Sequence, residues 1–81
     1  MKDISQFLKE TISSCTNIDI NEIDSNTSIS KSPEWDSLAH MRILSILSDK
    51  FQFELNPEVI INLSSYELLL NYLNYLKNDK Q

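Results

Sequence analysis

Glycine is absent from the 81-residue sequence, and proline occurs only twice. Without glycine, the chain cannot form the glycine-rich loop with which one large class of nucleotide-binding enzymes holds phosphate groups. Its turns must be built from Asn, Asp, Ser and Pro, which favour turns through side-chain hydrogen bonds or a fixed φ angle. The composition therefore excludes that class of enzyme.

Cysteine is also scarce, and Cys15 is the single thiol. One cysteine cannot form an intrachain disulfide, which fits a reducing compartment and predicts a cytoplasmic location. Cys15 continues an apolar stripe, so we interpret it as a packed thiol without chemistry.

No apolar run approaches the ~20 residues that cross a bilayer, and Lys2 and Asp3 open a mixed segment. We therefore expect neither membrane insertion nor a signal peptide.

Basic residues are the minority among the charges, with 7 Lys and Arg against 12 Asp and Glu and a net charge of −5. This imbalance argues against nucleic acid or an anionic membrane as the partner, and it favours basic surfaces on other proteins.

The length and the 41% apolar content predict one small domain over residues 1–81, near the lower limit for a self-sufficient core. We expect a monomer.

Apolar side chains recur at helical spacing in four segments, which predicts four helices. Three of them are main helices and one is short, which gives an all-α, small four-helix bundle with a long first loop. The predicted helices cover residues 4–16, 37–51, 57–62 and 65–77.

Helix-start signals support these boundaries. Asp3 precedes the first apolar stripe and is a suitable N-cap. Asn56 followed by Pro57 is a favoured pair at the beginning of a helix. Ser64 and Glu67 match a capping box, in which each side chain accepts a hydrogen bond from the other residue's amide. The last helix is therefore predicted to begin just after Ser64.

The connection over residues 17–36 is long for so small a domain. Four isolated isoleucines within it can hold it against a helical core, and a short helical turn is possible over 21–24. These isoleucines are Ile18, Ile20, Ile23 and Ile29. Trp35, near the end of the connection, is interpreted either as a lid of the core over the loop or as a recognition residue.

The connection ends in Asp36-Ser37-Leu38, where the second helix begins. Asp36 is a good N-cap, so Ser37 falls at the first helical position with its hydroxyl at the corner between loop and helix. A phosphate ester formed there would lie beside free amides at the positive end of the helix dipole. The same residues also cap ordinary helices, so the tripeptide alone does not decide between these roles.

The whole chain resembles an acyl carrier protein in its length, its helix order and the position of Asp36-Ser37-Leu38. In that family a transferase attaches phosphopantetheine from coenzyme A to the Ser of this motif, and acyl groups are carried as thioesters on the arm. The resemblance implies that Ser37 carries covalent 4'-phosphopantetheine, with Asp36 and Leu38 beside it. It also implies a protein that is not an enzyme, and the sequence offers neither a convincing catalytic group nor a metal site.

The implied partners are a phosphopantetheinyl transferase and the enzymes that load and transfer acyl groups. We expect them to contact residues around the start of the second helix, namely Trp35, Ala39, His40, Met41 and Arg42. In carriers of primary fatty-acid synthesis this helix is usually strongly acidic, whereas here its charges sum to +1. A small residue is also common there in place of Trp35. These departures favour a specialised pathway over primary fatty-acid synthesis.

Three alternatives remain open at this point. An aminoacyl or peptidyl carrier is one, although such carriers typically show paired glycines ahead of the Ser and this chain has none. An unmodified helical module that binds proteins through its second helix is another. A small hydrolase using Ser37 and His40 is the third. Against it, we interpret His40 as a surface residue near the arm, and the sequence indicates no third catalytic residue.

Overall fold

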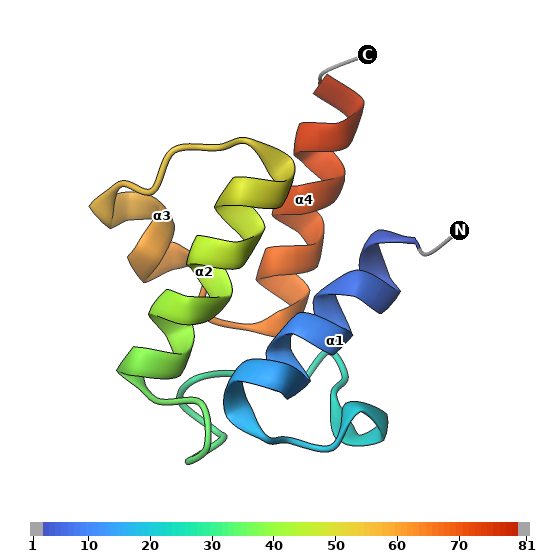
Figure 1. The fold of residues 1–81 in the computed structure, drawn as a ribbon, viewed down its shortest axis with the longest axis vertical. Helices are drawn as coiled ribbons and strands as arrows, with labels where there is room; N and C mark the ends of the chain where they lie inside the picture. The colour runs from blue at the N-terminus through green and yellow to red at the C-terminus, as the bar shows by residue number, and fades with distance from the viewer. Residues whose placement is uncertain (1–2, 80–81) are drawn as a thin grey trace.

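The computed structural model describes residues 3–79, which form four α-helices and no strand. The helices are α1 (Ile4–Thr16), α2 (Ser37–Phe51), α3 (Pro57–Asn62) and α4 (Tyr66–Asp79). In Figure 1, α1 packs beside both α2 and α4, and the short α3 lies on the far side of α2 from α1. The fold is therefore the predicted all-α bundle with three main helices and one short helix.

The first three helices have the bounds that the sequence predicts, and α4 differs at both ends. It begins at Tyr66 and continues through Asp79, whereas the sequence predicts a helix over about 65–77. Residues 1, 2, 80 and 81 lie outside the described part of the chain. Lys2, one of the two residues on which the prediction about a signal peptide rests, is among them.

Side-chain caps explain where α1 and α3 begin. An Asp3 carboxylate oxygen accepts a hydrogen bond from the amide of Gln6 at 2.8 Å. The Asn56 side chain accepts one from the amide of Val59 at 2.9 Å, ahead of a proline in the first turn of α3. Both predicted caps are confirmed.

The start of α4 corrects the predicted capping box. Ser65, not Ser64, lies in the cap position, and its Oγ accepts a hydrogen bond from the amide of Leu68 at 3.1 Å. Because the cap lies one residue later than predicted, Leu68 occupies the position where a capping box requires Glu or Gln. Glu67 therefore lies one place too early to complete the box.

Without glycine, the chain ends two helices at residues that adopt the left-handed conformation. Asn17 follows α1 with φ of 68°, and its amide donates to the carbonyl of Ser13. Gln52 follows α2 with φ of 59°, and its amide donates to the carbonyl of Ser48. A residue with a Cβ pays about 1–2 kcal/mol for this conformation, which Asn tolerates best.

A single cluster of buried apolar side chains holds the helices together. The members with no exposed surface are Leu8, Ile12, Ile43, Leu44, Leu47, Leu69 and Leu73. They come from α1, α2 and α4, so each main helix turns one stripe toward the centre.

The long connection is fixed to this cluster by its apolar residues. Ile18 and Ile23 are buried and Ile29 packs against the cluster, which confirms three of the four predicted contacts. Ile20 instead opens the short 3₁₀ turn Ile20–Glu22, which overlaps the helical turn predicted over 21–24. The amide of Ile29 donates to the Ser64 carbonyl at 3.0 Å, so the connection is also bonded to the start of α4.

Candidate functional site

Ser37 is the first residue of α2, and its side chain is exposed. The cap ahead of it is formed by Asp36, whose Oδ1 accepts a hydrogen bond from the amide of Ala39 at 2.9 Å. The amides of Ser37 and Leu38 have no carbonyl one turn earlier in the helix to accept from them. An exposed hydroxyl therefore stands beside free N–H donors, and these donors fit a phosphate ester on Ser37.

The Asp36 cap can be tested separately from its charge. We expect Asp36→Ala to lower the free energy of unfolding by about 0.5–2 kcal/mol, because it removes the acceptor for the Ala39 amide. Asp36→Asn keeps an acceptor at that position and should retain most of the stability. Urea unfolding followed by circular dichroism measures both variants, and equal losses for Ala and Asn would contradict the capping role.

An apolar and cationic face of α2 extends from Ser37 toward the middle of the helix. Leu38 is 64% exposed and Met41 41% exposed, although both belong to apolar positions of the sequence. The exposed Arg42 lies next to Met41. We call these three residues the α2 face.

Three of the five predicted partner-binding residues are not on this face. Trp35 is 1% exposed and Ala39 and His40 are each 5% exposed, so in the free protein these three side chains offer a partner little surface. The interpretation of Trp35 as a lid of the core is confirmed. The interpretation of His40 as a surface residue is wrong, because its ring packs between the loop and α3.

The His40 imidazole makes two hydrogen bonds, one buried and one partly buried. The Trp35 indole N–H donates to its Nδ1 at 3.1 Å, and its Nε2 lies 2.8 Å from the carbonyl oxygen of Ile60 in α3. An indole nitrogen can only donate and a carbonyl can only accept. The ring is therefore neutral, with its proton on Nε2.

Both ring nitrogens of His40 are thus engaged away from Ser37. A general base must have a free nitrogen within reach of the hydroxyl that it deprotonates. The arrangement gives no support to a hydrolase built from Ser37 and His40. The sequence does not predict these two hydrogen bonds. Its one indication of them is that the single Trp and the single His lie on either side of the Asp36 cap.

Cys15 lies half-buried on α1 near Arg42. Burial raises the pKa of the thiol, and the Arg42 guanidinium partly opposes that rise. A raised pKa lowers the thiolate fraction at neutral pH and with it the reactivity. This agrees with the interpretation of Cys15 as a packed thiol.

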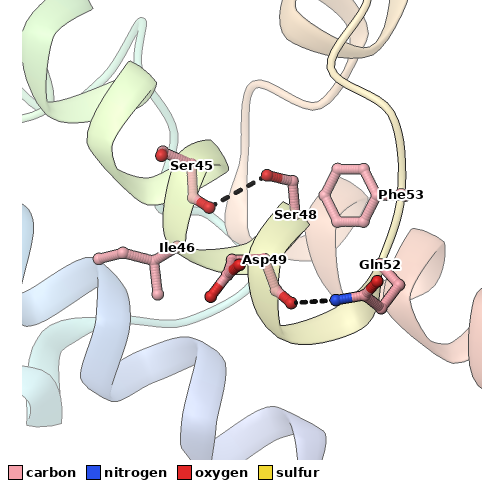
Figure 2. Close-up of a pocket in the computed structure, with 6 residues that line it drawn as sticks. All are labelled: Ser45, Ile46, Ser48, Asp49, Gln52 and Phe53. Atoms are coloured by element: carbon pink, nitrogen blue, oxygen red, sulfur yellow. Dashed lines mark hydrogen bonds between the residues drawn. The ribbon is translucent and has the colours of Figure 1, made fainter.

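Figure 2 shows a surface hollow lined by Ser45, Ile46, Ser48, Asp49, Gln52 and Phe53. It lies at the end of α2, whereas Ser37 is the first residue of that helix. Two of its polar side chains bond the helix backbone: Ser48 Oγ donates to the Ser45 carbonyl, and Gln52 Nε2 donates to the Asp49 carbonyl. The hollow begins two turns beyond Ser37, so we do not include it in the candidate site.

The described part of the chain lacks two other features that could indicate a function. Residues 3–79 contain no group of three or more His, Cys, Asp and Glu side chains placed to hold a metal ion. None of the helices described has the length and apolar character needed to span a bilayer.

Comparison with known protein families identifies the chain. The family described as "Phosphopantetheine attachment site" matches residues 6–73, a span that runs from α1 into α4 and contains the Asp36 cap and Ser37. A search of curated proteins found no match. The match covers most of the 81 residues, and the all-α bundle agrees with it. The chain therefore belongs to the phosphopantetheine attachment site family, whose domains carry covalent 4'-phosphopantetheine.

Proposed function

We propose that this protein is an acyl carrier whose phosphopantetheine arm is attached to Ser37. The observation that carries the proposal is the position of the Ser37 hydroxyl, exposed at the first residue of α2 within the matched span. When attached, the arm supplies a terminal thiol that holds an acyl group as a thioester. The helical body supplies a fixed and accessible point of attachment.

Local contacts explain why Ser37 suits this role. Asp36 directs its carboxylate to the Ala39 amide and leaves the amides of Ser37 and Leu38 for the phosphate of the ester. Leu38 is exposed beside the hydroxyl, where a transferase has to dock. Each residue of the motif thus has a separate task in presenting the hydroxyl.

We further propose a cytoplasmic carrier of acyl rather than aminoacyl or peptidyl groups, serving a specialised pathway. The single thiol supports the location, and the absence of paired glycines ahead of Ser37 supports the acyl type. Arg42 supports a specialised pathway, because carriers of primary fatty-acid synthesis usually present an acidic second helix to basic partners. The partners proposed are a phosphopantetheinyl transferase and acyl-transferring enzymes.

Partner enzymes are proposed to dock on the α2 face of Leu38, Met41 and Arg42. The two apolar side chains are exposed next to Ser37, so a partner that reaches the hydroxyl covers them. Arg42 would repel a basic partner surface at this point and attract an acidic one.

Charge reversal at Arg42 tests this docking surface. With a transferase that presents a basic surface to its carriers, we expect Arg42→Glu to lower the KM for loading several-fold and to leave kcat unchanged. The gain should shrink as salt is raised, because exposed charges are screened. Lys50→Glu makes the same charge change in the last turn of α2 and should have little effect. Equal effects of the two substitutions would contradict docking at Arg42.

Modification itself is tested by incubation with coenzyme A, Mg²⁺ and a promiscuous phosphopantetheinyl transferase. We expect the intact mass to increase by one phosphopantetheine group. An unchanged mass with an active transferase would reject the carrier and favour the unmodified binding module. Native mass spectrometry of protein from its own cell, before the thioester hydrolyses, then identifies the cargo.

A further inference from the structure

We propose that His40 is a positioning residue that holds the backbone around Ser37 in the conformation that a transferase requires. This inference rests on the proposed function, since it concerns the modification of the same hydroxyl. His40 makes no bond to the Ser37 hydroxyl. It acts by holding α2 to the loop before the cap and to α3.

Three segments meet at the His40 ring. The ring belongs to the first turns of α2, Trp35 belongs to the end of the connection, and Ile60 belongs to α3. Trp35 precedes Ser37 by two residues and His40 follows it by three. The bond from Trp35 to His40 therefore closes the chain into a small loop with Ser37 on its exposed side.

The cap completes this small loop from within. The Asp36 side chain accepts from the Ala39 amide at 2.9 Å, and the Asp36 carbonyl accepts from the His40 amide at 2.9 Å. Backbone and side-chain bonds thus fix both the residue before Ser37 and the residue three after it. With both sides held, the backbone at Ser37 is fixed relative to the axis of α2, and with it the direction of the Ser37 Cα–Cβ bond.

The burial of the His40 ring also supports a positioning role. An imidazole that is 5% exposed costs free energy unless its nitrogens are bonded, and an apolar side chain would fill the space without that requirement. Both nitrogens of His40 are bonded, each to a partner in a different segment. Directional bonds restrict the relative placement of segments in a way that apolar packing does not.

Transferase kinetics test the inference. With coenzyme A and a promiscuous phosphopantetheinyl transferase, we expect His40→Leu to lower kcat by about 10- to 100-fold with little change in KM, because the docking face stays intact while the hydroxyl is misplaced. His40→Gln offers both a donor and an acceptor and should recover part of kcat. Trp35→Phe removes one of the two bonds and should fall between the parent and His40→Leu.

A control variant separates positioning from lost stability. Leu73→Val opens a small space in the core at a fully buried position of α4 and should leave kcat unchanged. All rates are compared at a temperature at which circular dichroism shows each variant folded. If His40→Leu does not fold, His40→Gln and Trp35→Phe decide the question.

Nuclear magnetic resonance gives a readout independent of loading, because the chain has one Trp and one His. We expect ¹⁵N shifts of a neutral ring protonated on Nε2, and an indole N–H of Trp35 that exchanges slowly with solvent and exchanges faster in His40→Leu. A doubly protonated ring at neutral pH, or a kcat within twofold of the parent in His40→Leu and Trp35→Phe, would overturn the inference. A parent protein that takes up no phosphopantetheine would instead reject the proposed function.

Discussion

Ser37→Ala is expected to take up no phosphopantetheine under conditions in which the parent protein is fully modified. The substitution removes the only atom at this corner that can form the ester, the exposed hydroxyl at the first position of α2. Intact mass after incubation with coenzyme A, Mg²⁺ and the transferase measures the result. No partial activity is expected, because alanine offers no nucleophile.

Two other serines on α2 serve as matched controls. Ser45 and Ser48 lie further along the same helix, at the hollow of Figure 2, and Ser45 is exposed like Ser37. Ser45→Ala and Ser48→Ala should be modified as fully as the parent. An exposed alanine at the start of α2 is expected to change the stability by no more than about 0.5 kcal/mol, so misfolding would not explain a loss. Modification that survives in Ser37→Ala would place the arm elsewhere.

The sequence predicts the helix boundaries well where local chemistry sets them. Asp3, Asp36 and Asn56 each accept from an amide three residues later, as their type and position indicate. A cap depends on a few neighbouring residues, so one sequence contains the information needed to find it. The same locality explains the failure at α4, where Ser64 and Ser65 are chemically equal. There the bonds to the connection, which the sequence does not show, decide between them.

The faces of α2 were harder to predict, because apolar and polar residues exchange their usual places there. Leu38 and Met41 point to solvent, and His40 points to the interior. Hydrophobic periodicity alone assigns Leu38 and Met41 to the core, and only the family resemblance implies that they are accessible. Neither signal places His40 in the interior. The partner that holds His40 inside is a backbone carbonyl, that of Ile60, 20 residues later in the chain. Every residue has a backbone carbonyl, so the sequence does not indicate which one bonds His40. Only the fold shows this contact.

Departures from the usual burial of apolar residues and exposure of polar ones are expected near functional sites, where binding or positioning sets the residue type. The reversal here surrounds Ser37: exposed apolar side chains lie beside it and a buried polar ring lies beneath it. The motif Asp36-Ser37-Leu38 was visible in the sequence, whereas the support that Trp35 and His40 give it was not. Motif residues are identified by type and spacing, but supporting residues are identified by contacts between segments.

Trp35→Ala is expected to cause the largest loss of stability among the substitutions considered. The indole is 1% exposed and is the largest of the fully buried side chains, and truncating a buried Trp costs about 3–5 kcal/mol. A domain of this length has a total stability of about 4–12 kcal/mol. Trp35→Ala should therefore be partly or largely unfolded at 25 °C. Urea unfolding must be followed by circular dichroism, because the substitution removes the single Trp fluorophore.

Two comparisons identify the source of that loss. Ile61→Ala truncates an apolar side chain that is 72% exposed, and it should change the free energy of unfolding by no more than about 0.5 kcal/mol. Trp35→Phe keeps most of the buried ring and deletes the N–H that bonds His40, so it should lose about 1–3 kcal/mol through the bond and the reduced volume. If Trp35→Ala lost no more than Ile61→Ala, the indole would not be part of the core. The loop before Ser37 would then be held by something other than Trp35 and His40.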